Sequence, residues 1–118
     1  DLNYSGICVG WGWTKLDSSM KHNIIRRNKV HDFAQQLYDA GGIYTLSYQP
    51  ESQIVDNEIY NIGATPYATN DRSFYIYFDE PTDGFLAKGN KFSTTRPLPN
   101  ITFGYNKPGP NMKIEDKP

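Results

Sequence analysis

The sequence VHDFAQQLYDAGG, residues 30–42, decides the predicted fold class, because its apolar residues recur at intervals of three and four. On an α-helix that spacing would gather on one face the residues Val30, Phe33, Ala34, Leu37 and Tyr38. Gly41 and Gly42 follow and are typical of a helix C-terminal stop. We therefore predict one main helix within residues 19–40, with this face packed against a sheet.

The chain on either side of this segment is rich in β-formers. Candidate strands are residues 4–14, 43–48, 53–62, 73–78, 91–95 and 101–105, and the third quarter contains an unbroken aromatic run, Phe74–Phe78. The predicted fold class is α+β, with one main helix packed on an antiparallel sheet of about five strands. The alternative is a fragment of an all-β sandwich with a helical insertion. No internal repeat is evident.

The length of 118 residues predicts one domain, which we place at residues 1–105. Residues 106–118 form a Pro-rich extended C-terminal tail that has too few apolar residues to order itself by burial. We expect Met112 and Ile114 to anchor this tail on another surface, partly that of a second chain. The chain begins at Asp1, so we interpret it as a product processed from a longer chain.

A cluster of basic residues is the strongest local charge bias, although the formal net charge is only -1. No acidic residue lies between Asp17 and Asp32. The candidate anion-binding residues are His22, Arg26, Arg27 and Lys29. The alternative is a solvated helix face. A sequence pI near 6.1 argues against nucleic-acid binding by the whole protein and leaves only this local patch for it.

Aromatic residues make up 14% of the chain, and many have polar neighbours. Rings beside amide and hydroxyl groups are typical of surfaces that stack on sugars or bases. The candidate recognition aromatics are Trp11, Trp13, Tyr44, Tyr48, Tyr75 and Tyr77. The alternative is that these rings fill a core that has few aliphatic residues.

Catalytic and cofactor motifs are not evident. The two histidines are nine residues apart, no metal-ligand spacing occurs, and the glycines form no nucleotide-binding motif. We predict no metal, no cofactor and no catalytic residue, and we expect Cys8 to be a buried, unreactive thiol in an apolar strand. Asp79, Glu80 and Asp83 surround Pro81, as in an exposed turn, although paired carboxylates can also act as acid and base.

Three functional interpretations remain open. The first is a non-catalytic structural or interaction subunit of a larger assembly, such as a virion, a filament or a complex, with other protein chains as partners. The second is an extracellular or surface recognition module that binds glycan through exposed Tyr and Trp. The third is a small enzyme of unknown type. No apolar run is long enough to span a membrane, and an extracellular or virion location is favoured.

Overall fold

The computed structural model describes residues 1–13, 19–63, 72–93 and 101–117. Within these residues the fold is all-β, and no helix is found. All strand pairs are parallel. The predicted α+β fold with an antiparallel sheet is therefore wrong, and so is the sandwich with a helical insertion.

The strands form three parallel sheets. Sheet A contains β1 (Ile7–Val9), β4 (Ala40–Thr45), β7 (Ser73–Phe78) and β10 (Phe103–Tyr105). Sheet B contains β2 (Ile24–Arg26), β5 (Tyr48–Val55), β8 (Asp83–Lys88) and β11 (Lys113–Ile114). Sheet C contains β3 (Lys29–His31), β6 (Glu58–Tyr60) and β9 (Lys91–Ser93). Thr14 and residues 94–95, which belong to two predicted strands, lie outside the described residues.

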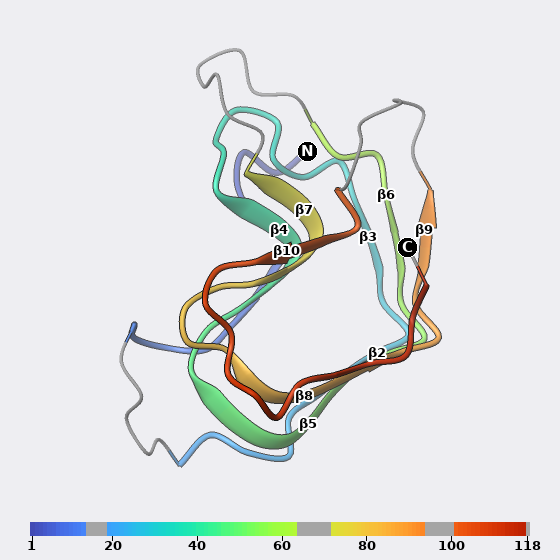
Figure 1. The fold of residues 1–118 in the computed structure, drawn as a ribbon. Helices are drawn as coiled ribbons and strands as arrows, with labels where there is room; N and C mark the ends of the chain where they lie inside the picture. Colours follow the sequence, from blue (N-terminus) through green and yellow to red (C-terminus); the bar gives the residue numbers. More distant parts are fainter. Residues whose placement is uncertain (14–18, 64–71, 94–100, 118) are drawn as a thin grey trace.

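The chain visits the sheets in the order A, B, C and then returns to sheet A one strand further along. This winding is a parallel β-helix, in which each turn, or coil, stacks on the one before. Figure 1 shows β4, β7 and β10 together on one side of the coil, β5 and β8 on the second side, and β3, β6 and β9 on the third.

The core lies inside the coils, where residues in register form apolar rows. Sheet A contributes Ile7, Ile43, Ile76 and Phe103, sheet B contributes Ile25, Ile54, Ala87 and Ile114, and sheet C contributes Val30, Ile59 and Phe92. Burying a side chain such as Ile54 contributes about 1.5–3 kcal/mol. The rows therefore fix which residue of each strand faces inward.

Turn residues explain why residues 19–40 do not form a helix. Arg27, Asp32, Ala34 and Asp39 all adopt left-handed φ angles between 53° and 59°, which interrupt a right-handed helix. Val30 and Phe33 do face the core, whereas Leu37 is 52% exposed and Tyr38 is 44% exposed. The apolar spacing of three and four therefore combines one inward strand residue (Val30), two buried turn residues (Phe33 and Ala34) and two surface residues.

A ladder of side-chain amides joins the coils at the turn between sheets B and C. We call it the asparagine ladder. It consists of Asn28, Asn57 and Asn90, and on the last described coil the carboxylate of Asp116 accepts the hydrogen bond from Asn90. The residue before each asparagine has a positive φ angle: 57° for Arg27, 56° for Asp56 and 71° for Gly89. The recurrent ladder contradicts the expectation that the chain has no internal repeat.

Candidate functional site

The candidate site lies on the outer face of sheet A and at its C-terminal edge. Cys8, Tyr44, Tyr77 and Gly104 share one register row on this sheet. Tyr44, Tyr77 and Leu46, with Phe74 against them, form a small cluster separate from the main core. Because parallel strands end at the same edge, the residues that follow β1, β4, β7 and β10 are brought together there.

Asp79 is the most enclosed carboxylate of this edge. It follows β7 directly and is 4% exposed. Its oxygens accept hydrogen bonds from the hydroxyl of Tyr44, from the side-chain amide of Asn106 at 2.7 Å and from the backbone N–H of Glu80 at 2.8 Å. Three donors on one buried carboxylate fix its orientation.

A second carboxylate, Asp39, lies directly before β4, at the opposite edge of sheet A from Asp79. It accepts a hydrogen bond at 3.0 Å from the hydroxyl of Tyr77, and its backbone carbonyl accepts one at 2.9 Å from the hydroxyl of Tyr4. The rings of Tyr44 and Tyr77 meet edge to face, with centroids 5.3 Å apart. We call Tyr44, Tyr77, Asp39 and Asp79 the tyrosine–carboxylate network.

The tyrosines of this network are held in their protonated form. Burial is the largest cause that raises the pKa of Tyr44, followed by its hydrogen bond to Asp79. Burial likewise raises the pKa of Tyr77, followed by its hydrogen bond to Asp39. Both phenols therefore stay neutral hydrogen-bond donors well above neutral pH.

Two exposed tryptophans flank the C-terminal edge of sheet A. Trp11 is 85% exposed and Trp13 is 68% exposed. The segment that carries them lies against β4, because a Cβ on Gly10 would lie 2.2 Å from the carbonyl oxygen of Leu46 and its φ angle is 132°. The hydroxyl of Ser47 donates hydrogen bonds to the carbonyls of Trp11 and Gly12, the latter at 3.2 Å.

Glu80 provides a more accessible carboxylate beside Asp79. Its side chain is 35% exposed and forms an ion pair at 3.1 Å with Lys107, which follows β10. Chemically, the edge therefore combines apolar ring faces, a reachable acid, a cation and a buried, oriented carboxylate.

The six predicted recognition aromatics separate into three locations. Trp11, Trp13, Tyr44 and Tyr77 lie at the sheet A face. Tyr75 is buried in the main core and donates a hydrogen bond to the carbonyl of Ser93 at 2.8 Å. Tyr48 begins β5 and lines a hollow on the outer face of sheet B. Of the six, Trp11, Trp13 and Tyr48 are exposed, whereas Tyr44, Tyr75 and Tyr77 are buried.

The predicted basic cluster does not share a helix face. His22 pairs with Glu51 at 3.1 Å, Arg26 with Asp56 at 3.5 Å, and Lys29 with Glu58 at 3.5 Å, while Arg27 is exposed at a turn. Each of these three acids belongs to the next coil, so the basic side chains of one coil meet the carboxylates of its neighbour. Anion binding by this cluster stays a prediction. Three of its four basic side chains already pair with a carboxylate of the neighbouring coil.

The C-terminal segment is attached to this chain's own coils. Met112 and Ile114 pack against the main core, and β11 pairs with β8. Asp83 accepts hydrogen bonds from the backbone and side-chain amides of Asn111 at 2.7 and 2.8 Å.

The exposed-turn interpretation of the three acids around Pro81 is wrong for Asp79 and Asp83, because both are buried.

Cys8 is exposed, which contradicts the expected buried thiol. Its strand was correctly placed, but alternation puts Ile7 and Val9 against the core and Cys8 on the outer face beside Tyr44. Sequence reasoning also missed Asp39 and Tyr4, because neither belongs to a motif and their partners Tyr77 and Asp39 are more than 30 residues away in the chain.

The part of the chain that the structure describes shows neither a metal-binding cluster nor a membrane-spanning helix. The described residues hold no group of three or more His, Cys, Asp or Glu placed to bind a metal ion. No helix long and apolar enough to cross a membrane occurs among them.

Comparisons with known proteins give one informative similarity. No family model matches the chain, and no curated protein matches it. The chain is similar to part of a solved structure named "Glycoside hydrolase", with 31% sequence identity and a TM-score of 0.83. The match covers 94% of this chain and 18% of that one, so this chain spans less than a fifth of the length of its structural neighbour.

Proposed function

We propose that this chain is a glycan-binding segment of a β-helical protein of the glycoside hydrolase type, and that the sheet A face contacts the sugar. The observation that carries the proposal is the placement of Trp11 and Trp13, both exposed, beside the buried Tyr44–Asp79 pair at one edge of one sheet. The similarity to part of a glycoside hydrolase supports this interpretation better than an assembly subunit.

The residues of this edge suit a polyhydroxylated ligand. Ring faces such as those of Trp11 and Trp13 can cover the apolar faces of a sugar, and a few placed polar groups then orient it. Glu80 and Lys107 offer an acceptor and a donor for sugar hydroxyls. The buried tyrosine–carboxylate network holds the strands beneath in a fixed arrangement.

Titration calorimetry with neutral oligosaccharides of several linkages tests glycan binding by the full chain. Trp11→Ala and Trp13→Ala should each weaken binding by about tenfold or more, since a stacked ring contributes ~1–3 kcal/mol. Tyr60→Ala is the matched control, because Tyr60 lies on sheet C, stacked on His31. No binding to any oligosaccharide, or an equal loss in the control, would contradict the proposal.

Glycosidic bond hydrolysis is a second candidate function. It is favoured by the adjacent carboxylates Asp79 and Glu80, one buried and oriented by three donors and the other accessible. Glycoside hydrolysis uses a pair of carboxyl groups in different environments. In this hypothesis Glu80 donates a proton to the leaving oxygen as the glycosidic bond breaks, and a water that loses its proton to Asp79 forms the new bond to the anomeric carbon.

Reducing-end release from a bound oligosaccharide tests this second function. Glu80→Gln should abolish release while it leaves binding within about twofold, because the amide keeps the size of the side chain. Glu115→Gln, which alters an ion pair on sheet B, is the control. If the wild-type chain binds sugar without releasing reducing ends, it is a binding segment only.

A further inference from the structure

The outer face of sheet B carries a groove that the proposed function does not use. Two hollows of about 480 and 430 Å³ lie side by side on it. Gln53 and Leu86 line both hollows and therefore lie where the two meet; we call the two hollows together the sheet B groove. A volume of 300–1,000 Å³ is typical of sites for small ligands.

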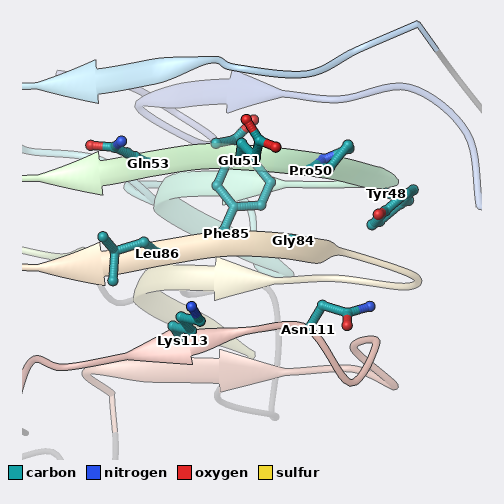
Figure 2. A pocket seen from close by; sticks show the side chains of 10 residues that line it. Tyr48, Pro50, Glu51, Gln53, Gly84, Phe85, Leu86, Asn111 and Lys113 are labelled. Carbon is teal, nitrogen blue, oxygen red and sulfur yellow. The ribbon is translucent and has the colours of Figure 1, made fainter.

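Side chains of three neighbouring strands line the larger hollow (Figure 2). Glu51 and Gln53 come from β5, Leu86 comes from β8, and Lys113 comes from β11. Tyr48, which is 36% exposed, closes one end. The lining therefore combines a ring, an aliphatic floor and groups that donate or accept hydrogen bonds.

Charge pairing singles out one residue of this groove. Arg26 pairs with Asp56 at 3.5 Å, and Lys88 pairs with Glu115 at 2.9 Å. Glu51 faces the imidazole of His22 at 3.1 Å. Among the described residues Lys113 has no ion pair, so it is the lining cation left to meet an external anion.

Lys113 also has a fixed place relative to the floor. Ile24, Gln53, Leu86 and Lys113 share one register row across sheet B. A ligand that lies over Leu86 therefore meets the amide of Gln53 on one side and the ammonium of Lys113 on the other. That arrangement suits a ring that carries both hydroxyls and a carboxylate.

We propose that the sheet B groove binds an acidic oligosaccharide, one whose sugars carry carboxylates. Lys113 binds a carboxylate, Gln53 and Glu51 bind hydroxyls, and Tyr48 covers an apolar ring face. This site is separate from the sheet A face. Its ligand is negatively charged, whereas the ligand proposed for sheet A is a neutral oligosaccharide. It needs neither hydrolysis nor the tryptophans.

Titration of the full chain with a tetramer of galacturonic acid, and with a neutral tetramer of xylose, tests the site. The acidic tetramer should bind, and Lys113→Gln should weaken it about fivefold, as expected when one exposed charge contact is lost. Lys117→Gln is the matched control, because Lys117 is an exposed lysine of the same segment that does not line the groove. Added salt should weaken the wild type more than Lys113→Gln.

Three results would overturn the proposal. The first is no binding of the acidic tetramer by the wild-type chain, and the second is an equal loss in Lys113→Gln and Lys117→Gln. The third is loss of acidic-tetramer binding in Trp11→Ala with no change in Lys113→Gln, which would place that ligand on sheet A. The neutral tetramer should still bind to Lys113→Gln, because it binds to the sheet A face. A failure of the sheet B proposal can therefore be told apart from a failure of the sheet A proposal.

Discussion

Asn57 and Asn90 occupy the same position in successive coils, and the side-chain amide of Asn57 donates to the side-chain oxygen of Asn90 at 2.9 Å. Asn57 also donates to the carbonyl of Ile25 at 3.0 Å and accepts the backbone N–H of Asn28 at 3.0 Å. One fully buried side chain thus joins three coils. Because water cannot replace these bonds, the ladder is a determinant of stability.

Asn57→Ala should lower the free energy of unfolding by about 3 kcal/mol, because it leaves buried backbone groups of Ile25 and Asn28 without partners. Urea unfolding followed by circular dichroism measures this change. Asn3→Ala, at an exposed position, is the control and should change stability by less than about 0.5 kcal/mol. Equal stabilities of the two variants would show that the ladder contributes little.

Phe33→Ala and Leu37→Ala distinguish the β-helix from the helix expected from sequence. Phe33 is fully buried and meets Tyr75 edge to face at 6.2 Å, whereas Leu37 is 52% exposed. Phe33→Ala should therefore cost about 3–5 kcal/mol and Leu37→Ala less than about 1 kcal/mol. Similar losses, measured by thermal or urea unfolding, would support a shared helical face instead.

Stability should fall as the pH rises above about 10, the usual pKa of an unfolded tyrosine. Burial and a hydrogen bond to Asp79 raise the pKa of Tyr44 in the folded protein, so the unfolded chain releases its proton first. The stability that this shift contributes is present below pH ~10 and is lost above it.

Tyr44→Phe should make the loss of stability between pH 9 and pH 11 (about one unit on either side of the usual tyrosine pKa) shallower than in the wild type. Tyr38→Phe, at an exposed tyrosine, is the control and should follow the wild type. Urea midpoints across that range measure the slopes. If the slope for Tyr44→Phe matches that of the wild type, the Tyr44–Asp79 pair does not couple to folding.

Cys8 should react with a maleimide in the native state, because its side chain is exposed on the sheet A face. Bound glycan should slow this labelling, since Cys8 lies in the same register row as Tyr44. Mass spectrometry over time measures the rate with and without the oligosaccharide that calorimetry identifies. Labelling that occurs only after unfolding would show that Cys8 is covered in solution.

Asp83→Ala should loosen the C-terminal segment, because Asp83 accepts two hydrogen bonds from Asn111. Hydrogen exchange should become faster at β11 and stay slow at β5. Glu58→Ala, which removes an exposed ion pair with Lys29 away from this segment, is the control. If exchange at β11 is unchanged, Asp83 does not hold this segment in place. Contact with a second chain, as predicted from the sequence, would then explain why the segment is ordered.

Some of this fold could be predicted from sequence, because strong β-formers mark residues 73–78, which are β7, and residues 43–48, which overlap β4 at residues 43–45. The triplets around residues 29–31 and 58–60 are too short to show an alternating pattern, and their strand partners are a whole coil away. A signal was nevertheless present. Asn, a charged residue and an apolar residue occur in that order at Asn28–Val30, Asn57–Ile59 and Asn90–Phe92.

The candidate site was only partly predictable for a related reason. Trp11, Trp13, Tyr44 and Tyr77 were identified by residue type, but only the two tryptophans are exposed, because packing between the coils buries Tyr44 and Tyr77. Residue type could not distinguish Tyr77, on the outer face, from Tyr75, in the core, because the aromatic run is continuous. Asp39 and Asp79 become neighbours of this row only through contacts between coils.

The ion pairs between the first two coils also select the order in which coils stack during folding. Lys29 lies in register with Glu58, and Glu58 with Lys91. A misfolded chain that skipped the middle coil would place Lys29 against Lys91 and Arg26 against Lys88, with like charges facing each other. The asparagine ladder would tolerate that error, because Asn28, Asn57 and Asn90 are the same residue type. Surface charge therefore disfavours a wrong order of coils that the asparagine ladder alone would accept.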